Sequence, residues 1–326
     1  MALPSTGAIS LNAVNVELGL SGTTTISMNQ ASVRTLFGVA SGQISMSDGY
    51  GKSNYGNVDT FSTTLSTVNW TVPTGVISIW VKMWGAGGHG GGGGVSAGGG
   101  GGFISGYMAV TPGSTVKIMT GVGGFRNDEP EDCDNNTAGA NDVTGGSASV
   151  VYYNSSTYMI AGAGGAGSRD GSDSPGGAGG GTNGVNGTGT NGGQGAQGGT
   201  GGTGGASSSS ECSSSDGANH SAPTLSGGNI ASPGYGASVD VSICGYTACR
   251  SEGTGGGGGY AGGGATDELS GGGGGSSGAA NFIDIINTAG SGTAPGGTSD
   301  TDYNSSYGGG GAAGVEGEGG FVVIRY

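Results

Sequence analysis

The chain has 326 residues, of which 85 are glycine, 8 are basic and 22 are acidic. Its net charge of −14 argues against binding to a nucleic-acid backbone or to anionic lipid, because both would repel it. Glycine usage far above the average of roughly 7%, together with an apolar fraction of 33%, excludes a large ordinary hydrophobic core.

At the N-terminus, Met1–Gly7 has neither the basic nor the apolar stretch of a signal peptide. No apolar run further along is long enough to span a bilayer. We therefore expect a protein that is made in the cytoplasm without a secretion signal and released by lysis.

Residues 1–56 contain an internal repeat, in which an Ile-Ser pair begins the segments Ile9–Asn12, Ile26–Asn29 and Ile44–Ser47 at spacings of 17 and 18. Each serine is placed to cap a short helix, and Gly19 and Gly38 are placed to end the first two. The pattern predicts a small α/β N-terminal domain. It is too short to be stable alone, and docking on a partner would explain it.

Residues 57–165 read as β-structure, because short apolar segments alternate with turn residues. In the clearest strand, 76–84, apolar side chains occupy every second position. Turns are predicted at Pro112-Gly113 and at 154–156. Strands are predicted at 58–65, 68–72, 76–84, 103–110, 114–120, 147–153, 157–161 and 320–326. The expected fold is mainly β: a jelly-roll-like β-sandwich built from 57–165 with 318–326.

Glycine is concentrated after Trp84, and residues 166–317 are predicted to be an insertion in the sandwich. Between 176 and 205 glycines follow a three-residue period, with one phase at Gly177, Gly180, Gly189, Gly192, Gly195, Gly198, Gly201 and Gly204. Three residues per turn is the period of the polyproline-II helix; collagen shares it but needs far more proline than the 8 present. Side chains would stop such helices from exchanging main-chain hydrogen bonds. The period therefore predicts a bundle of polyglycine-II helices.

Two stretches resemble known proteins. Residues 9–53 (ISLNAVNVELG through ISMSDGYGKS) look like an N-terminal segment of tailed-phage virion proteins. Residues 71–326, from TVPTGVISIWVKMWGAGG to the closing GGFVVIRY, are similar to glycine-rich phage adhesins, including T-even-like tail-tip adhesins that pack polyglycine-II helices. They also resemble the glycine-rich domain of the anaplastic lymphoma kinase receptor family. The segments 126–144 and 206–252 depart from the pattern and inherit nothing from it.

The resemblance implies a virion protein of a phage tail. Residues 1–56 would bind other tail or virion proteins, and the distal part would bind a host polysaccharide or outer-membrane protein. A homo-oligomer is also implied, with the trimer as the common form of such fibres, although no heptad pattern specifies one. The alternative function is purely structural: a capsid decoration or a fibre-shaft protein without a receptor.

Tyrosines among Gly and Ser are the candidate receptor-binding residues, because rigid aromatic rings beside small polar groups suit recognition. Tyr235 and Tyr246 are favoured, with His220 as a weaker candidate. For Tyr260 a binding role and a packing role are weighed equally. The four cysteines allow three pairings, of which Cys244–Cys249 with Cys133–Cys212 is one; free thiols remain the alternative to disulfides.

Catalytic and metal motifs are weak. Gly94–Gly98 matches the G-x-S-x-G nucleophile motif around Ser96, but no helix follows it, so we expect no enzymatic activity. No cofactor is implied. Asp132, Asp134 and Asn136 alternate as in a calcium loop but lack its glycine and its final glutamate, which leaves calcium binding as a weak alternative to a solvated loop.

Overall fold

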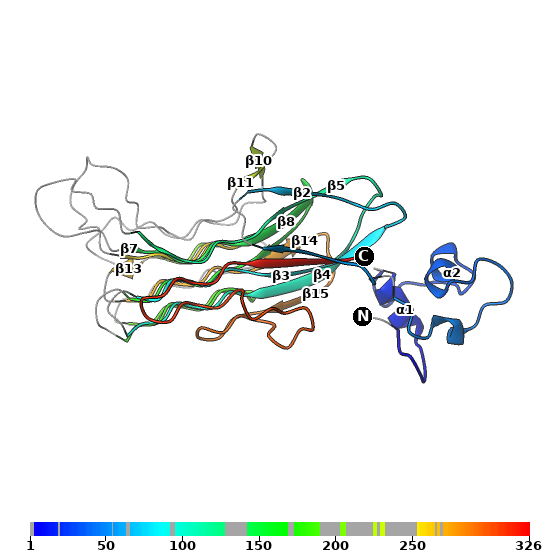
Figure 1. The fold of residues 1–326 in the computed structure, drawn as a ribbon, viewed down its shortest axis with the longest axis horizontal. Helices are drawn as coiled ribbons and strands as arrows, with labels where there is room; N and C mark the ends of the chain where they lie inside the picture. The colour runs from blue at the N-terminus through cyan, green and yellow to red at the C-terminus, as the bar shows by residue number, and fades with distance from the viewer. Residues whose placement is uncertain are drawn as a thin grey trace, which may run out of the picture.

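A computed structural model describes most of the chain: residues 3–18, 20–53, 55–62, 66–91, 95–127, 142–168, 173–189, 203–206, 224–226, 229–231, 253–264, 266–267 and 270–326. Three parts follow one another along the long axis of the molecule (Figure 1). A small helical domain lies at one end, two β-sheets lie in the middle, and extended glycine-rich segments run from the sheets to the other end.

The N-terminal domain contains α1 (Leu11–Glu17), α2 (Ala31–Phe37) and the 3-10 helix η1 (Met46–Gly49). The cap of α1 is confirmed, since the Ser10 hydroxyl accepts a hydrogen bond from the Ala13 N–H at 3.1 Å. The end of α2 is also confirmed, since Gly38 has the left-handed φ of +74° that glycine adopts without strain.

The second predicted cap is wrong. Gln30, not Ser27, precedes α2, and the Ser27 hydroxyl instead accepts from the Asn29 N–H at 3.2 Å. The regular elements described between residues 3 and 53 are all helical, so the expected α/β character is corrected to helical. One small core joins them, formed by Leu3, Val14, Leu18, Val33, Leu36 and Phe37.

Two five-stranded antiparallel sheets form the middle of the molecule, which confirms a mainly β fold. The first has the order β1 (Val58–Ser62), β16 (Phe321–Arg325), β3 (Ser78–Trp84), β4 (Phe103–Ala109) and β15 (Ile283–Thr288). The second has the order β14 (Gly278–Ala280), β9 (Thr157–Ala161), β8 (Ser149–Asn154), β5 (Thr115–Met119) and β2 (Val68–Thr71). All eight strands predicted from the sequence are present.

One core lies between the two sheets. Ile79, Val81 and Met83 of β3 alternate toward it, as the period of two predicts, and they meet Ile118 and Met159 of the other sheet. All five side chains are fully buried or nearly so. The C-terminal strand β16 lies between β1 and β3, which confirms that the end of the chain completes this sheet.

Strands β14 and β15 correct the expected division of the chain. Both lie within 166–317, which the sequence predicts to be an insertion, yet β14 pairs with β9 and β15 pairs with β4. Phe282, between them, is 7% exposed and belongs to the core between the sheets. The middle of the molecule therefore includes residues 278–288. The remaining short strands are β6 (Arg126–Asn127), β7 (Asp142–Val143), β10 (Thr224–Ser226), β11 (Asn229–Ala231), β12 (Gly253–Thr254) and β13 (Thr266–Asp267).

The outer face of the first sheet is covered by residues 296–307, here called the strap. Tyr303 and Tyr307 of the strap pack on a cluster of Trp84, Phe103, Phe321 and Val323. Lys82, whose side chain is 1% exposed, reaches Asp300 at 2.8 Å and Asp302 at 2.7 Å. Arg325 also binds Asp302. These ion pairs fix the strap to β3 and β16.

Tyr55 lies in the linker that joins the N-terminal domain to the sheets, and its side chain is 2% exposed. Its ring lies 5.3 Å from that of Tyr107 and 6.4 Å from that of Trp80. Its hydroxyl lies 3.0 Å from that of Ser78. This buried side chain anchors the linker to the first sheet.

Candidate functional site

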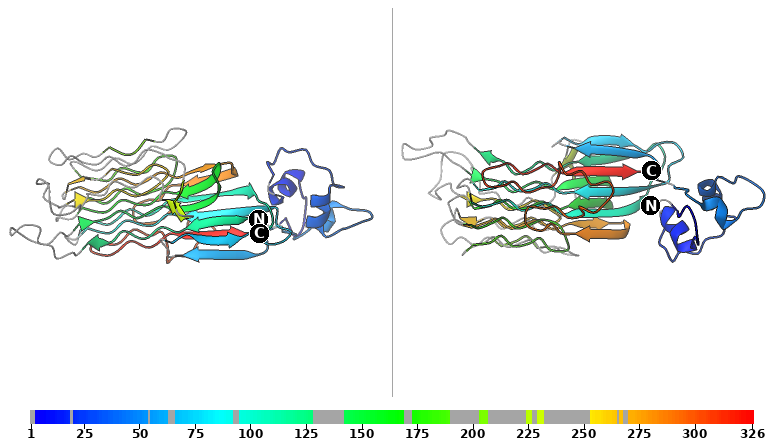
Figure 2. Two further views of the ribbon diagram at one scale, coloured as in Figure 1. Left: turned by 90° about the horizontal axis from the view of Figure 1, so that it is seen from above. Right: turned by 60° about the horizontal axis from the view of Figure 1, so that its bottom comes forward.

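The glycine-rich segments continue directly from the strands and lie side by side (Figure 2). We call them rods. The rod 85–91 follows β3, the rod 97–102 leads into β4, and the rod 162–168 follows β9. Because each rod extends a strand, the sheets set where the rods begin and how they line up.

The rod 85–91 donates hydrogen bonds with a period of three. Residues 85, 88 and 91 donate their N–H groups to carbonyls in 96–102, at 2.8 to 2.9 Å. Residues 86 and 89 donate to 144–147, and residues 87 and 90 donate to 315–318. Successive residues thus point to three different neighbours, which a β-strand with its period of two cannot do.

The carbonyls of the same rod accept from three further neighbours. Those of residues 86 and 89 accept from 164 and 167, those of 88 and 91 accept from 311 and 314, and that of 87 accepts from 124. This rod is therefore surrounded by six segments. The rod 162–168 is surrounded in the same way: it donates to 255–258, 86–89 and 174–177, and it accepts from 99–102, 272–275 and 146.

The spacing between rods explains where glycine is required. A Cβ added at 85, 88 or 91 would come closer than 3.0 Å to the backbone of 162–168, and one added at 87 or 90 would meet 309–312 equally closely. Real Cβ atoms essentially never make such contacts. The two non-glycine residues of this rod, Ala86 and His89, occupy the third face.

The same rule holds in the second inner rod. Glycines 162 and 165 face 272–275, and glycines 164 and 167 face 97–99, so that a Cβ on either face would meet backbone. Ala163 and Ala166 occupy the remaining face and are fully buried. In both rods the x-Gly-Gly rhythm therefore corresponds to two closely packed faces and a third face that accepts a side chain.

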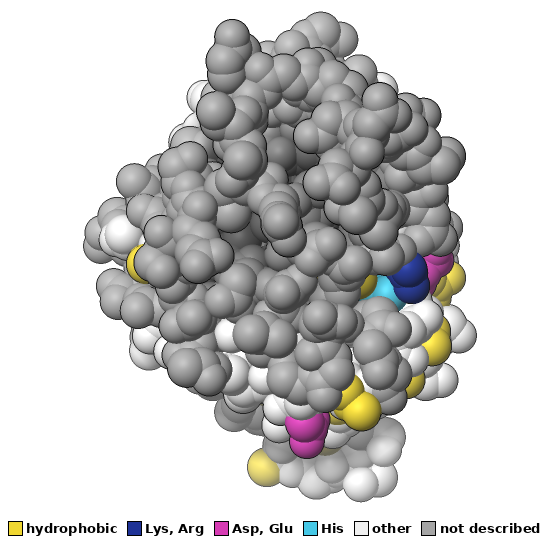
Figure 3. Space-filling view, turned by 90° about the vertical axis from the view of Figure 1, so that its left-hand side faces the viewer, with side chains coloured by type: hydrophobic (Ala, Val, Ile, Leu, Met, Phe, Trp, Pro, Cys, Tyr) yellow, Lys and Arg dark blue, Asp and Glu magenta, His cyan; other side chains and the backbone are white. Residues whose placement is uncertain are grey.

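Large apolar side chains lie on the outside of the rods. Val95, Phe125, Val185 and Val315 are 45% to 54% exposed. Figure 3 looks onto the end of the molecule where the rods terminate, and apolar side chains are visible among the residues described there. Since the rods leave no room between them for such groups, their exposure follows from packing and does not by itself indicate a partner.

The candidate receptor-binding residues Tyr235, Tyr246 and His220 lie outside the described residues. The same is true of the cysteines predicted as possible disulfides, Cys133, Cys212, Cys244 and Cys249, and of the calcium candidates Asp132, Asp134 and Asn136. The period-three segment 176–205 is described only at 176–189 and 203–205. There, the N–H groups of Gly177 and Gly180 donate to the carbonyls of Gly272 and Gly275 at 2.8 Å.

Other candidates are described and are buried. Tyr260 is 8% exposed and packs on the outer face of the second sheet. Its burial favours the packing role over the binding role. Ser96 is fully buried, and its hydroxyl lies 2.6 Å from that of Ser168. The G-x-S-x-G match is therefore part of the rod packing.

The acid–base chemistry of the described residues centres on the strap. Burial acts to raise the pKa of the Asp302 carboxyl, but hydrogen bonds from Arg325 and Lys82, together with their charges, outweigh it and lower the pKa to about 2. This charged group serves as a structural anchor, because Lys82 and Arg325 surround it.

Within the described residues, no three His, Cys, Asp or Glu side chains gather as metal ligands would. Over the same residues, no helix combines the length and apolar character needed to cross a bilayer. No protein-family model and no curated protein sequence matches the chain.

Proposed function

We propose that the protein is a non-enzymatic component of a phage tail, a tail-fibre or tail-tip adhesin that binds a host surface component. The rods are proposed to be polyglycine-II helices, the paired sheets a jelly-roll-like sandwich, and residues 1–56 the module that attaches the chain to the virion. The observation that carries the proposal is the period of three in the main-chain bonding of 85–91 and 162–168.

The physical argument is that this bonding makes a stiff support from residues that would otherwise be unfolded. Ordering glycine costs more backbone entropy than ordering any other residue. Each main-chain hydrogen bond returns only about 1 kcal/mol net, so the rods need many bonds at once. Six neighbours around each inner rod supply them. Such a support suits the display of loops at a fixed distance from the particle.

The arrangement of the parts agrees with this role. The helical N-terminal domain and the free ends of the rods lie at opposite ends of the long axis (Figure 1). Attachment at one end would leave the other end directed away from the particle. The predicted receptor-binding residues Tyr235 and Tyr246 belong to segments that interrupt the rods in sequence. Several copies on one virion would raise weak single-site affinity through avidity.

The test is competition for adsorption. Purified full-length chain is added to host cells before the phage, and the rate of phage adsorption is measured. We expect a concentration-dependent decrease, and the double variant Tyr235→Ala/Tyr246→Ala should compete less well while unfolding at the same temperature. A chain that is present on virions but never slows adsorption would favour the structural alternative, a decoration or shaft protein.

A further inference from the structure

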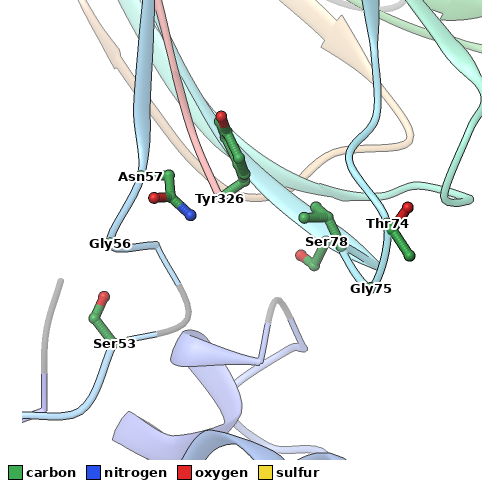
Figure 4. A pocket seen from close by; sticks show the side chains of 8 residues that line it. Ser53, Gly56, Asn57, Thr74, Gly75, Ser78 and Tyr326 are labelled. Carbon is green, nitrogen blue, oxygen red and sulfur yellow. The ribbon is translucent and has the colours of Figure 1, made fainter.

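Strand β1 forms one edge of the first sheet and is paired on one side only. All five of its residues pair with β16, in a continuous antiparallel register. Asn57, just before β1, and Tyr326, just after β16, lie side by side (Figure 4) and exchange two main-chain hydrogen bonds, at 2.8 and 3.1 Å. This pair fixes which residues of β1 bond to β16, because hydrogen-bonded pairs alternate along an antiparallel ladder.

The alternation leaves a row of main-chain groups directed away from the sheet. Asp59 and Phe61 bond to β16, so Val58, Thr60 and Ser62 point their N–H and C=O groups outward. Within the part of the chain that the structure describes, no hydrogen bond reaches these outward groups. Val58 is 42% exposed and Thr60 is also exposed. Such an edge is a template on which another strand can pair.

The other three edges of the two sheets carry features that oppose such pairing. Strand β15 has a bulge and the exposed Asp284, whose φ is +51°. Strand β14 has only three residues. Strand β2 has four, and the Lys117 ammonium lies 2.9 Å from the side chain of Asn69 in it. Bulges, short strands and lysine all protect edges, whereas β1 has five regularly paired residues, with neither proline nor lysine.

Asp59 gives this edge a negative charge that no basic side chain neutralises. The Trp70 indole donates to its carboxylate at 2.7 Å. Burial raises the pKa of the Tyr326 hydroxyl, and the neighbouring charge of Asp59 raises it further. Among the described residues, Asp59 takes part in no ion pair. On an added strand, the residue directly opposite Asp59 would place its side chain on the same face, where a basic group would be favoured.

We propose that β1 binds an extended segment of a partner protein, which pairs antiparallel as a sixth strand of the first sheet and carries lysine or arginine opposite Asp59. In this mode the main-chain hydrogen bonds supply affinity and alternate side chains supply specificity. The proposal rests on the proposed function only for the source of the segment. Because β1 directly follows the N-terminal domain, a virion protein is the expected source.

The distribution of charge favours a basic partner over a second copy of this chain. Residues 1–56 contain two acidic and two basic residues. Residues 57–326 therefore hold 20 acidic and 6 basic residues, which is the whole net charge of −14. Two copies paired through β1 would bring two such regions together, and like charges oppose that association.

Peptide binding to the full chain tests the proposal. The probe is a fluorescent seven-residue peptide in which threonine and valine alternate around a central lysine. One comparison peptide has glutamate in place of lysine, and another keeps lysine but has proline on both sides of it. We expect the lysine peptide to bind, the glutamate peptide to bind about fivefold more weakly, and the proline peptide not to bind. Amide hydrogen exchange at residues 58, 60 and 62 should slow when the lysine peptide is bound.

Thr60 allows an outward bond to be removed without touching those to β16. Thr60→Pro deletes an outward N–H, and proline is tolerated on edge strands where the N–H faces solvent. This change should weaken binding of the lysine peptide at least about fivefold. Thr60→Val keeps the N–H and is the matched control. Asp59→Asn keeps an oxygen for the Trp70 indole and should abolish the preference for lysine over glutamate.

Several results would overturn the proposal. These are no binding of the lysine peptide at millimolar concentration, binding without slower exchange at residues 58, 60 and 62, and equal binding of the lysine and glutamate peptides. Binding that Thr60→Pro leaves unchanged would do the same, and a dimer that Thr60→Pro dissociates in sedimentation would assign the edge to a second copy. If Thr60→Pro does not fold, the exchange measurement and Asp59→Asn decide. Competition for adsorption depends on the distal loops, so its failure with peptide binding intact would refute the adhesin proposal alone.

Discussion

A single added methyl group tests whether the rods pack through glycine faces. Gly165 lies on the inner rod 162–168, and a Cβ there would come closer than 3.0 Å to the main chain of Gly272. The substitution Gly165→Ala must push these rods apart. Gly56→Ala is the control, because a Cβ at Gly56 meets nothing within 4 Å and the backbone conformation is not left-handed.

The expected cost follows from the bonds that meet at this position. The N–H of Gly165 donates to the Gly177 carbonyl at 2.8 Å, and the Gly165 carbonyl accepts from Gly99 at 2.9 Å. Weakening two or three such bonds costs about 1 kcal/mol each, and overpacking a close-packed interior costs a further ~1–3 kcal/mol. Alanine has less conformational freedom than glycine in the unfolded chain, which offsets about 0.4–1 kcal/mol of this cost. We expect Gly165→Ala to lower the free energy of unfolding by about 3 kcal/mol.

The measurement is urea unfolding of the full chain, followed by amide hydrogen exchange of residues 162–168. The control Gly56→Ala should be neutral or slightly stabilising, because it only restricts the unfolded chain. Faster exchange in Gly165→Ala should be centred on the rods rather than on the sheets. If the free energies of unfolding of the two variants agree within about 0.5 kcal/mol, the close packing of the rods is refuted. Substitutions at unconstrained surface positions usually change stability by no more than about that amount.

Three other predictions concern the strap, the joint and the first helix. Because the pKa of Asp302 is lowered to about 2 in the folded chain, its contribution of about 2 kcal/mol should be present above pH 4 and be lost as the pH falls toward 2. Asp302→Asn should therefore flatten the stability–pH curve below pH 4, and an unchanged acid dependence would count against the anchor. Tyr55→Ala should lower the free energy of unfolding by about 3 kcal/mol and increase proteolysis at 51–57. Tyr50→Ala, at a 40% exposed position, should cause a smaller loss of stability and no increase in proteolysis there. Ser10→Ala should remove the cap of α1 and cost about 1 kcal/mol, while Ser27→Ala, which caps no helix, should cost less; equal losses in thermal unfolding would contradict the assignment.

Phe282 and Ile283 show where reading the sequence failed. The surrounding glycines place their segment in the predicted glycine-rich insertion, yet residues 278–288 add a strand to each sheet and Phe282 fills part of the core. The signal was present as the apolar run Phe282–Ile286, but the run contains Asp284, which has a φ of +51° at a bulge in β15. A strand interrupted in this way lacks the regular alternation on which strand prediction depends.

The sequence by itself determined the local structure: the strands with a period of two, the caps at Ser10 and Gly38, and the period of three in glycine. Each of these depends on neighbouring residues and on the steric limits of the backbone. Only the tertiary structure decided which rods meet, and therefore why Ala163 and Ala166 are tolerated where Gly165 is required. That distinction depends on the distance to a second segment more than 100 residues away at Gly272, and no local pattern records such a distance.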